Sequence, residues 1–323
     1  MARRSRSKGS RSAGIFLFLL GLFAGAGVLY LFMKSPGRVP TVAESAEPAA
    51  AAPSEPPRAS AHAVRHRPTP AVLAADHVEP DTPAAAPVAE TLPAPSGPLH
   101  GVRVALVIDD LGHDVDDLRP LVALGVPVTY SVLPFEEETP QVVAELRQRR
   151  AEILLHLPME PVHGQNPGPG ALLQGMSDGE LREKTEAALK AVPGAAGVNN
   201  HMGSLLSSEE GPMNAVLGVL AERGLFFLDS RTSAESVGYK VAISLGVPAA
   251  ERQVFLDGDP SPAAIHTQFL RLLNLARTKG SAIAIGHPHP ETLAALTREV
   301  PKAKAAGYEF VPVSYLLTRA GGE

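Results

Sequence analysis

The chain has 323 residues, a formal net charge of −5 and no cysteine. The net negative charge excludes a nucleic-acid partner held by general attraction to the phosphate backbone. The absence of cysteine excludes disulfides, thiolate metal sites and cysteine nucleophiles, so any metal ligands must be His, Asp or Glu. Only the sequence beyond about residue 100 has the composition of a folded domain, and its roughly 220 residues suffice for one α/β barrel.

The N-terminal 33 residues predict a membrane anchor. Residues 1–12 form a basic head with five Lys or Arg and no acidic residue, and residues 13–33 carry no charge. An uncharged run of this length spans the hydrocarbon core as a transmembrane helix. The positive-inside rule keeps the head in the cytoplasm, so we expect a single-pass protein of the inner membrane whose C-terminal domain lies in the periplasm or extracytoplasmic space.

Two fates of this segment are compatible with its sequence. The run ends in the bulky residues Leu29–Met33, which favours an uncleaved signal anchor. Cleavage within Ala24–Ala26 is the alternative. Residues 34–100 are rich in Pro and Ala and are typical of a disordered, partly polyproline linker.

From residue 101 to 319 the sequence alternates strand and helix signals. Apolar runs predict strands at 102–108, 126–133, 153–155, 196–199, 225–228, 252–256, 281–285 and 310–313. Helical patterns predict helices at 114–124, 139–149, 177–191, 211–223, 261–279 and 290–306. The alternation predicts a parallel sheet covered by helices. It favours a distorted or incomplete (β/α) barrel, with a doubly wound open sheet as the alternative.

Polar residues with ligand chemistry follow six of these expected strands. They are Asp109-Asp110, His156, Asn199-Asn200-His201, Asp229, Asp257 and Gly286-His287-Pro288-His289. Each residue alone has a simpler interpretation as a helix cap, a core histidine or part of a rigid loop. Because the carboxyl ends of parallel strands meet on one face, the joint pattern favours a single site there. One Asp with two or three His is a ligand set that suits zinc.

Five segments in chain order also form a recognisable family pattern. They are Val107–Gly112, His156–Pro161, Gly197–Ser204, Phe227–Arg231 and Ile285–Pro290. Over residues 102–317 the chain resembles the divergent polysaccharide deacetylases, a distant branch of the carbohydrate-esterase deacetylases. The resemblance implies a distorted β/α barrel and metal-dependent removal of N-acetyl groups from aminosugar polymers.

The resemblance also implies roles for individual residues. Asp109 would be the general base and His287 the general acid. Asp229 and Arg231 resemble supporting residues near the base, and His289 is a further candidate.

The metal ligands implied by the resemblance are Asp110 and His156, with a third ligand left open. The family usually has a second histidine four residues after the first, and this chain has Glu160 there. The third ligand is therefore either Glu160 or His201. We expect His201, because a second imidazole restores an Asp-His-His set.

These observations predict a metal-dependent hydrolase, with zinc as the expected ion, that removes N-acetyl or O-acetyl groups from an envelope polysaccharide or glycan. The alternative is a non-catalytic glycan-binding or envelope-scaffold domain that keeps the deacetylase fold. The substitution at Glu160 keeps this alternative open, and the absence of Trp with only five Tyr favours a small substrate or a reduced role. The sequence leaves the glycan and the oligomeric state open.

The anchor makes a testable prediction. Protease added to spheroplasts should remove the C-terminal domain, because the domain lies outside the membrane, and should leave the tether in the membrane fraction. Immunoblotting with antibodies against each end of the chain would check this. A soluble periplasmic product that begins near residue 27 would show instead that the segment is cleaved.

Overall fold

The structure, a computed structural model, describes residues 101–318. The expected anchor at 13–33 and linker at 34–100 lie outside the described residues, as does residue 319. Among the helices of residues 101–318, none combines the length and apolar character needed to cross a membrane.

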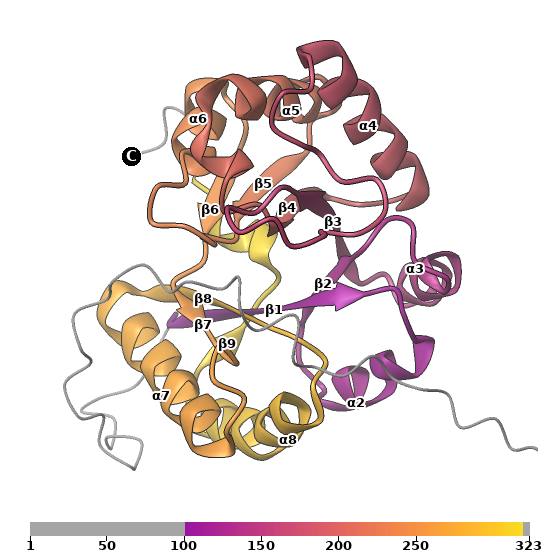
Figure 1. Cartoon of the computed structure of the whole chain (residues 1–323). Coiled ribbons are helices and arrows are strands. Elements are labelled where there is room, and N and C mark those ends of the chain that lie inside the picture. Colours follow the sequence, from indigo (N-terminus) through magenta and orange to yellow (C-terminus); the bar gives the residue numbers. More distant parts are fainter. Residues whose placement is uncertain (1–100, 319–323) are drawn as a thin grey trace, which may run out of the picture. The chain divides into compact units, whose positions relative to one another are not determined.

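Nine strands form one sheet at the centre of the described domain (Figure 1). They are β1 Arg103–Leu111, β2 Thr129–Val132, β3 Glu152–Met159, β4 Gly197–Met202, β5 Phe226–Asp229, β6 Ala249–Glu251, β7 Val254–Phe255, β8 Ser281–Gly286 and β9 Glu309–Phe310. Their order is β6-β5-β4-β3-β2-β1-β8-β7, with β9 also paired to β1. All of these pairings are parallel.

Helices lie around the outside of the strands (Figure 1). They are α2 Leu118–Ala123, α3 Thr139–Gln148, α4 Asp178–Ala191, α5 Glu210–Arg223, α6 Gly238–Ser244, α7 Pro262–Lys279 and α8 Pro290–Ala305. Three of them have an end that is fixed by residues with clear capping preferences. Ser177 and Glu180 form the capping box of α4, and Gly224 and Gly280 end α5 and α7 in the left-handed conformation.

The hydrophobic core has two layers, and the strands that share the inner layer distinguish a barrel from an open sheet. Val104, Leu106 and Ile108 of β1 belong to the large cluster beneath the helices, whereas Ala105 and Val107 belong to a smaller inner cluster. Strands from both ends of the row contribute to that inner cluster, including β5, β7 and β8. The sheet therefore curls around its own inner face, as in a barrel.

The barrel is incomplete, as the sequence predicted. Strands β6 and β7 end the row and, within residues 101–318, do not pair with each other. Val313, which is fully buried, and the partly buried Leu316 and Leu317 pack against the inner cluster from the C-terminal end of the chain. These side chains fill the space inside the curled sheet.

Three details differ from the elements expected from sequence. The helix expected at 114–124 is split into a 3-10 turn, Val115–Asp117, and α2, because the Asp114 side chain caps the turn. The strand expected at 310–313 ends at Phe310, and a 3-10 turn, Val313–Leu316, begins after Pro312. The sequence analysis also missed α6 and β6, whose seven and three residues are too short for a clear periodicity.

Close contact between β4 and β5 predicts a specific stability defect. A Cβ added at Gly197 would lie 2.6 Å from Cδ2 and 2.7 Å from the carbonyl oxygen of Phe226. Gly197→Ala should therefore lower the free energy of unfolding by about 1–3 kcal/mol, the usual cost of overpacking. Urea unfolding of the purified protein would measure it.

Gly211→Ala is the matched control, because nothing lies within 4 Å of a Cβ at this position in α5. That change should be neutral or stabilise by up to about 1 kcal/mol through helix propensity. Equal effects of the two changes would contradict the strand contact.

Candidate metal centre

The end of β1 delivers two neighbouring carboxylates to the inner side of the barrel. Regular alternation places Ala105, Val107 and then Asp109 on that side, while Leu111 returns to the outer cluster. The pairing of β1 with β2 shifts register between Ile108 and Leu111, and Asp110 has a φ of 58°. This bulge adds one residue to the strand, so Asp110 can face the same side as Asp109. A left-handed aspartate costs about 1–2 kcal/mol, a strain of the kind that is common at functional sites.

Asp110, His156 and His201 bring three ligand atoms together. Oδ1 of Asp110 lies 2.9 Å from Nδ1 of His201 and 3.2 Å from Nε2 of His156. The two imidazole nitrogens are 3.1 Å apart. These distances define a nearly equilateral triangle of donor atoms, which we call the ligand triangle. All three side chains are buried.

The ligand triangle has the dimensions that one ion requires. Three ligands at zinc bond lengths of about 2.1 Å are spaced roughly 3.0–3.4 Å from one another, depending on coordination number. Oδ1 of Asp110 is buried and has no hydrogen-bond partner of good geometry, although both imidazoles are close. A buried carboxylate oxygen without a partner is costly, and an ion bound by all three atoms would satisfy it.

Electrostatic interactions around the triangle favour the ionised carboxylate of Asp110 and the protonated imidazole of His156. Burial raises the pKa of Asp110, but His201 and His287 outweigh this effect and hold the pKa well below its ordinary value. Burial lowers the pKa of His156, but the carboxylates of Asp109 and Asp110 outweigh it, so the pKa is raised. An incoming cation would take the place of a proton on His156, as metal binding to imidazole requires.

Asp109 lies beside the triangle without belonging to it. Its two oxygens accept hydrogen bonds of 2.9 and 3.1 Å from Nδ2 of Asn199. Oδ2 of Asp109 lies 3.6 Å from Nε2 of His156. The carboxylate is thus buried, oriented and close to the position of an ion.

His287 faces the triangle from the position directly after β8, the strand that pairs with β1. Its Nδ1 donates to Oδ1 of Asp257 at 3.0 Å, and its Nε2 lies 3.8 Å from Oδ2 of Asp110. Burial lowers the pKa of His287, but the carboxylates of Asp257 and Asp110 outweigh it and raise the pKa to about 10. The imidazole therefore carries a proton at neutral pH and directs Nε2 toward the triangle.

Asp257 is the residue whose importance the sequence analysis did not assign. Its Oδ2 accepts from the His287 backbone N at 2.7 Å and from Oγ1 of Thr292 at 2.8 Å. His289 lies near enough to complete a second three-residue group with Asp257 and His287. Because both oxygens of Asp257 are already hydrogen-bonded, this group is better described as a carboxylate that orients an imidazole. The His289 ring stacks on His287 at 5.6 Å between centroids.

The side chain of Glu160 bonds to a loop and not to the residues of the ligand triangle. Its Oε2 accepts a hydrogen bond of 2.5 Å from the backbone N of Gln174 in the loop between β3 and α4. Among the described residues, two groups are close enough to share an ion, and neither contains Glu160, whereas His201 belongs to the group with Asp110 and His156. The geometry therefore favours His201 over Glu160 as the third ligand beside Asp110 and His156.

Asp229 and Arg231 shape the loop after β5. Asp229 Oδ1 accepts from the Arg231 backbone N, and Oδ2 accepts from Oγ of Ser236 and the backbone N of Tyr239, at 2.8–3.1 Å. The Arg231 guanidinium donates to the carbonyls of Ser236 and Ala234. Among the described residues, a hydrogen bond to the Asp109 side chain comes instead from Asn199, which the sequence analysis placed at a strand end without a role.

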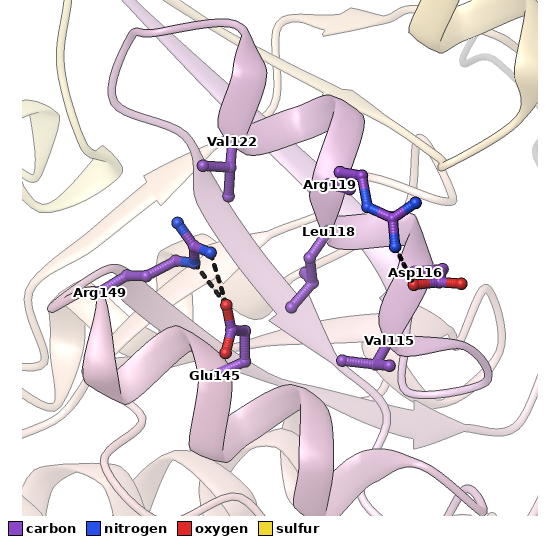
Figure 2. A pocket seen from close by; sticks show the side chains of 7 residues that line it. All are labelled: Val115, Asp116, Leu118, Arg119, Val122, Glu145 and Arg149. Atoms are coloured by element: carbon purple, nitrogen blue, oxygen red, sulfur yellow. Dashed lines mark hydrogen bonds and ion pairs between the residues drawn. The ribbon is translucent and has the colours of Figure 1, made fainter.

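A pocket of about 290 Å³ lies elsewhere, between α2 and α3 (Figure 2). Its lining is Val115, Asp116, Leu118, Arg119, Val122, Glu145 and Arg149. The two arginines are paired with Asp116 and Glu145 within their own helical segments. None of the predicted site residues lines this pocket, so it is separate from the candidate metal centre.

The comparisons with known proteins agree with this fold. Residues 106–317 match the family described as divergent polysaccharide deacetylase, and the chain belongs to that family. An uncharacterized Escherichia coli protein, YibQ, is 36% identical over 205 residues, which are 64% of this chain and 64% of that protein. An uncharacterized Haemophilus influenzae protein is 36% identical over 194 residues, 60% of this chain and 69% of its own length.

A solved structure also matches. The crystal structure of the uncharacterized protein ATU2773 from Agrobacterium tumefaciens C58 has 28% sequence identity and a TM-score of 0.64. It covers 70% of this chain and 93% of its own. The fold and the family together define a domain of the polysaccharide-deacetylase type.

The ligand triangle predicts the effect of removing a ligand. His201→Ala should weaken zinc binding by about 3 kcal/mol, more than 100-fold, since each ligand of a zinc site contributes about that much. Glu160→Ala should leave the affinity within a few-fold, because this carboxylate binds the Gln174 backbone instead. Calorimetric titration of both variants with zinc would measure the difference. The reverse ranking would make Glu160 the third ligand.

Proposed function

We propose that this chain is a metal-dependent hydrolase that removes N-acetyl or O-acetyl groups from an envelope polysaccharide or glycan. Membership of the divergent polysaccharide deacetylase family supports the reaction class. The observation that carries the proposal is the ligand triangle, in which a buried oxygen of Asp110 lacks a hydrogen-bond partner beside two imidazole nitrogens.

The donor set suits a divalent ion, and zinc matches one carboxylate and two imidazoles best. Asp110, His156 and His201 would hold it. Such an ion supplies Lewis-acid polarisation of an acyl carbonyl and makes water more acidic.

Asp109 has the position of a general base. Asn199 holds both of its oxygens, so the carboxylate is fixed next to the triangle rather than free to rotate. It would accept one proton from water as the water oxygen bonds to the carbonyl carbon.

His287 has the position of a general acid on the other side. Its Nδ1 proton is held by Asp257, and Nε2 is directed toward the triangle. As the bond between the carbonyl carbon and the sugar nitrogen or oxygen breaks, Nε2 would give its proton to that leaving atom. Acetic acid, which ionises to acetate by releasing its proton to solvent, and a free amine or hydroxyl result. Asp109 has then gained one proton and His287 has lost one, so net transfer of one proton from Asp109 to His287 through solvent restores the site.

We also propose the location inferred from the sequence. The basic head and the uncharged run at 13–33 would hold the domain at the outer side of the inner membrane. The linker at 34–100 would let it reach an envelope glycan.

A second candidate is a non-catalytic glycan-binding or scaffold domain. The observation that favours it is Glu160, which stands where the family usually has a histidine ligand and whose carboxylate holds the loop after β3. Metal binding separates the two candidates, because a scaffold has no need of an ion in the ligand triangle.

The acid and base roles predict variants that separate binding from catalysis. Asp109→Asn and His287→Ala should each lower acetate release by about 10²–10⁴-fold, the usual contribution of one proton-transfer group. Both should keep bound zinc, because neither residue belongs to the triangle. Acetate release from N-acetylated and O-acetylated sugar polymers and metal content by atomic absorption would be measured together.

Asp116→Asn is the control for these variants, since its exposed carboxylate pairs with Arg119 in the separate pocket. It should retain both zinc and activity. If the unaltered protein binds no zinc at micromolar concentration, the hydrolase proposal fails and the scaffold candidate replaces it.

A further inference from the structure

Asn199 lies at the centre of a hydrogen-bond network that joins two parts of the site. It is fully buried in β4 and pairs in register with His156 of β3. Its Oδ1 lies 3.0 Å from Nδ1 of His156, and its Nδ2 lies 2.9 and 3.1 Å from the oxygens of Asp109. One amide therefore contacts both the candidate base and a candidate metal ligand.

The chemistry of these partners fixes the orientation of the amide. Nδ2 of Asn199 donates to both oxygens of Asp109, so the NH₂ end of the amide faces Asp109. The carbonyl end then faces His156 and can only accept, which requires a hydrogen on Nδ1. The lone pair of the neutral imidazole is consequently on Nε2, the atom that belongs to the ligand triangle.

Two serines hold the amide in this orientation. Oγ of Ser131 donates to Oδ1 of Asn199 at 2.5 Å, and Nδ2 of Asn199 donates to Oγ of Ser230 at 3.2 Å. With these bonds each end of the amide has partners of the correct polarity. A reversed amide would place its NH₂ group against His156 and its oxygen against the carboxylate of Asp109.

We propose that Asn199 is a positioning residue that sets the Asp109 carboxylate and the metal-binding nitrogen of His156 at the same time. The inference rests on the proposed hydrolase function and assigns to one buried amide the relative placement of base and ion. In this role Asn199 would act through Asp109 and His156 and would not itself contact substrate or metal. Its effect is transmitted through the residues at its two ends.

Two variants separate the two ends of the amide. Asn199→Leu has a similar shape but removes both contacts, so it should weaken zinc binding about 10–100-fold, as loss of an orienting partner of a ligand does. It should also lower kcat. Asn199→Asp keeps an oxygen that accepts from Nδ1 of His156 but places a second carboxylate against Asp109. That variant should retain zinc affinity within about threefold while kcat falls at least tenfold and KM changes little.

The tautomer provides a readout that does not depend on activity. In the zinc-loaded full-length chain labelled with ¹⁵N-histidine, long-range proton–nitrogen spectra should show His156 with a hydrogen on Nδ1 and the metal on Nε2. His156→Gln assigns the signals. Asn199→Leu should lose the protected Nδ1 hydrogen, whereas Asn199→Asp should keep it.

Asn200→Leu is the matched control for a merely structural role. Asn200 is also buried in β4, but its side chain bonds the carbonyl of Met202, Oγ1 of Thr232 and the backbone N of Ser230. It should lower Tm without changing the His156 tautomer or the zinc affinity.

The outcomes separate this inference from the proposed function. If the unaltered chain binds zinc and Asn199→Leu retains both the affinity and the Nδ1 hydrogen, the positioning role is wrong and the hydrolase proposal stands. If Asn199→Leu does not fold, Asn199→Asp decides, since equal kcat in this variant and the unaltered chain would overturn the role. If the unaltered chain binds no zinc, both proposals fall.

Discussion

The burial of the Asp110 carboxylate is the constraint on which the site depends. A buried charge is tolerated in a protein only where opposite charges and hydrogen bonds compensate it. Here one oxygen of Asp110 lies among the imidazoles of His156 and His201 and lacks a hydrogen bond of its own. The surrounding strands thus hold a charge in an arrangement that a cation would complete.

The fold meets this constraint through the ends of its strands. A one-residue bulge turns Asp110 to the inner side of the barrel, where β3 and β4 present their imidazoles. The inner hydrophobic cluster fills the barrel below, so the polar groups of the candidate site lie at the face formed by the strand carboxyl ends. Shortly after β7, Asp257 orients His287, which follows β8, and raises its pKa. Asp109 and His287, the proposed base and acid, therefore approach the triangle from the ends of different strands.

The sequence predicted which strands and which polar residues form this face. Long apolar runs such as the one before Asp109, and glycines at helix ends such as Gly224, are local features of the sequence. The order of strands and helices could therefore be predicted from them. The bulge at Asp110 was not predictable, because it depends on the register between β1 and β2. The partners of Asn199 and Asp257 also come from residues 90 and 30 positions away, respectively, and no local pattern records such contacts.

The register of β3 and β4 explains how His201 can occupy the place of a ligand expected four residues after His156. His156 is opposite Asn199, so His201 lies two residues further along β4, opposite Pro158, on the same side of the sheet. In a histidine side chain, Nδ1 is closer to the backbone than Nε2. Nδ1 of His201 and Nε2 of His156 can therefore approach each other to 3.1 Å although the two residues are offset along the strands. A histidine on the neighbouring strand thus supplies the second imidazole, while Glu160 is left to hold the loop after β3. Because Asn199 and His201 share one side of β4, the strand that supplies this imidazole also supplies the amide that orients its partner.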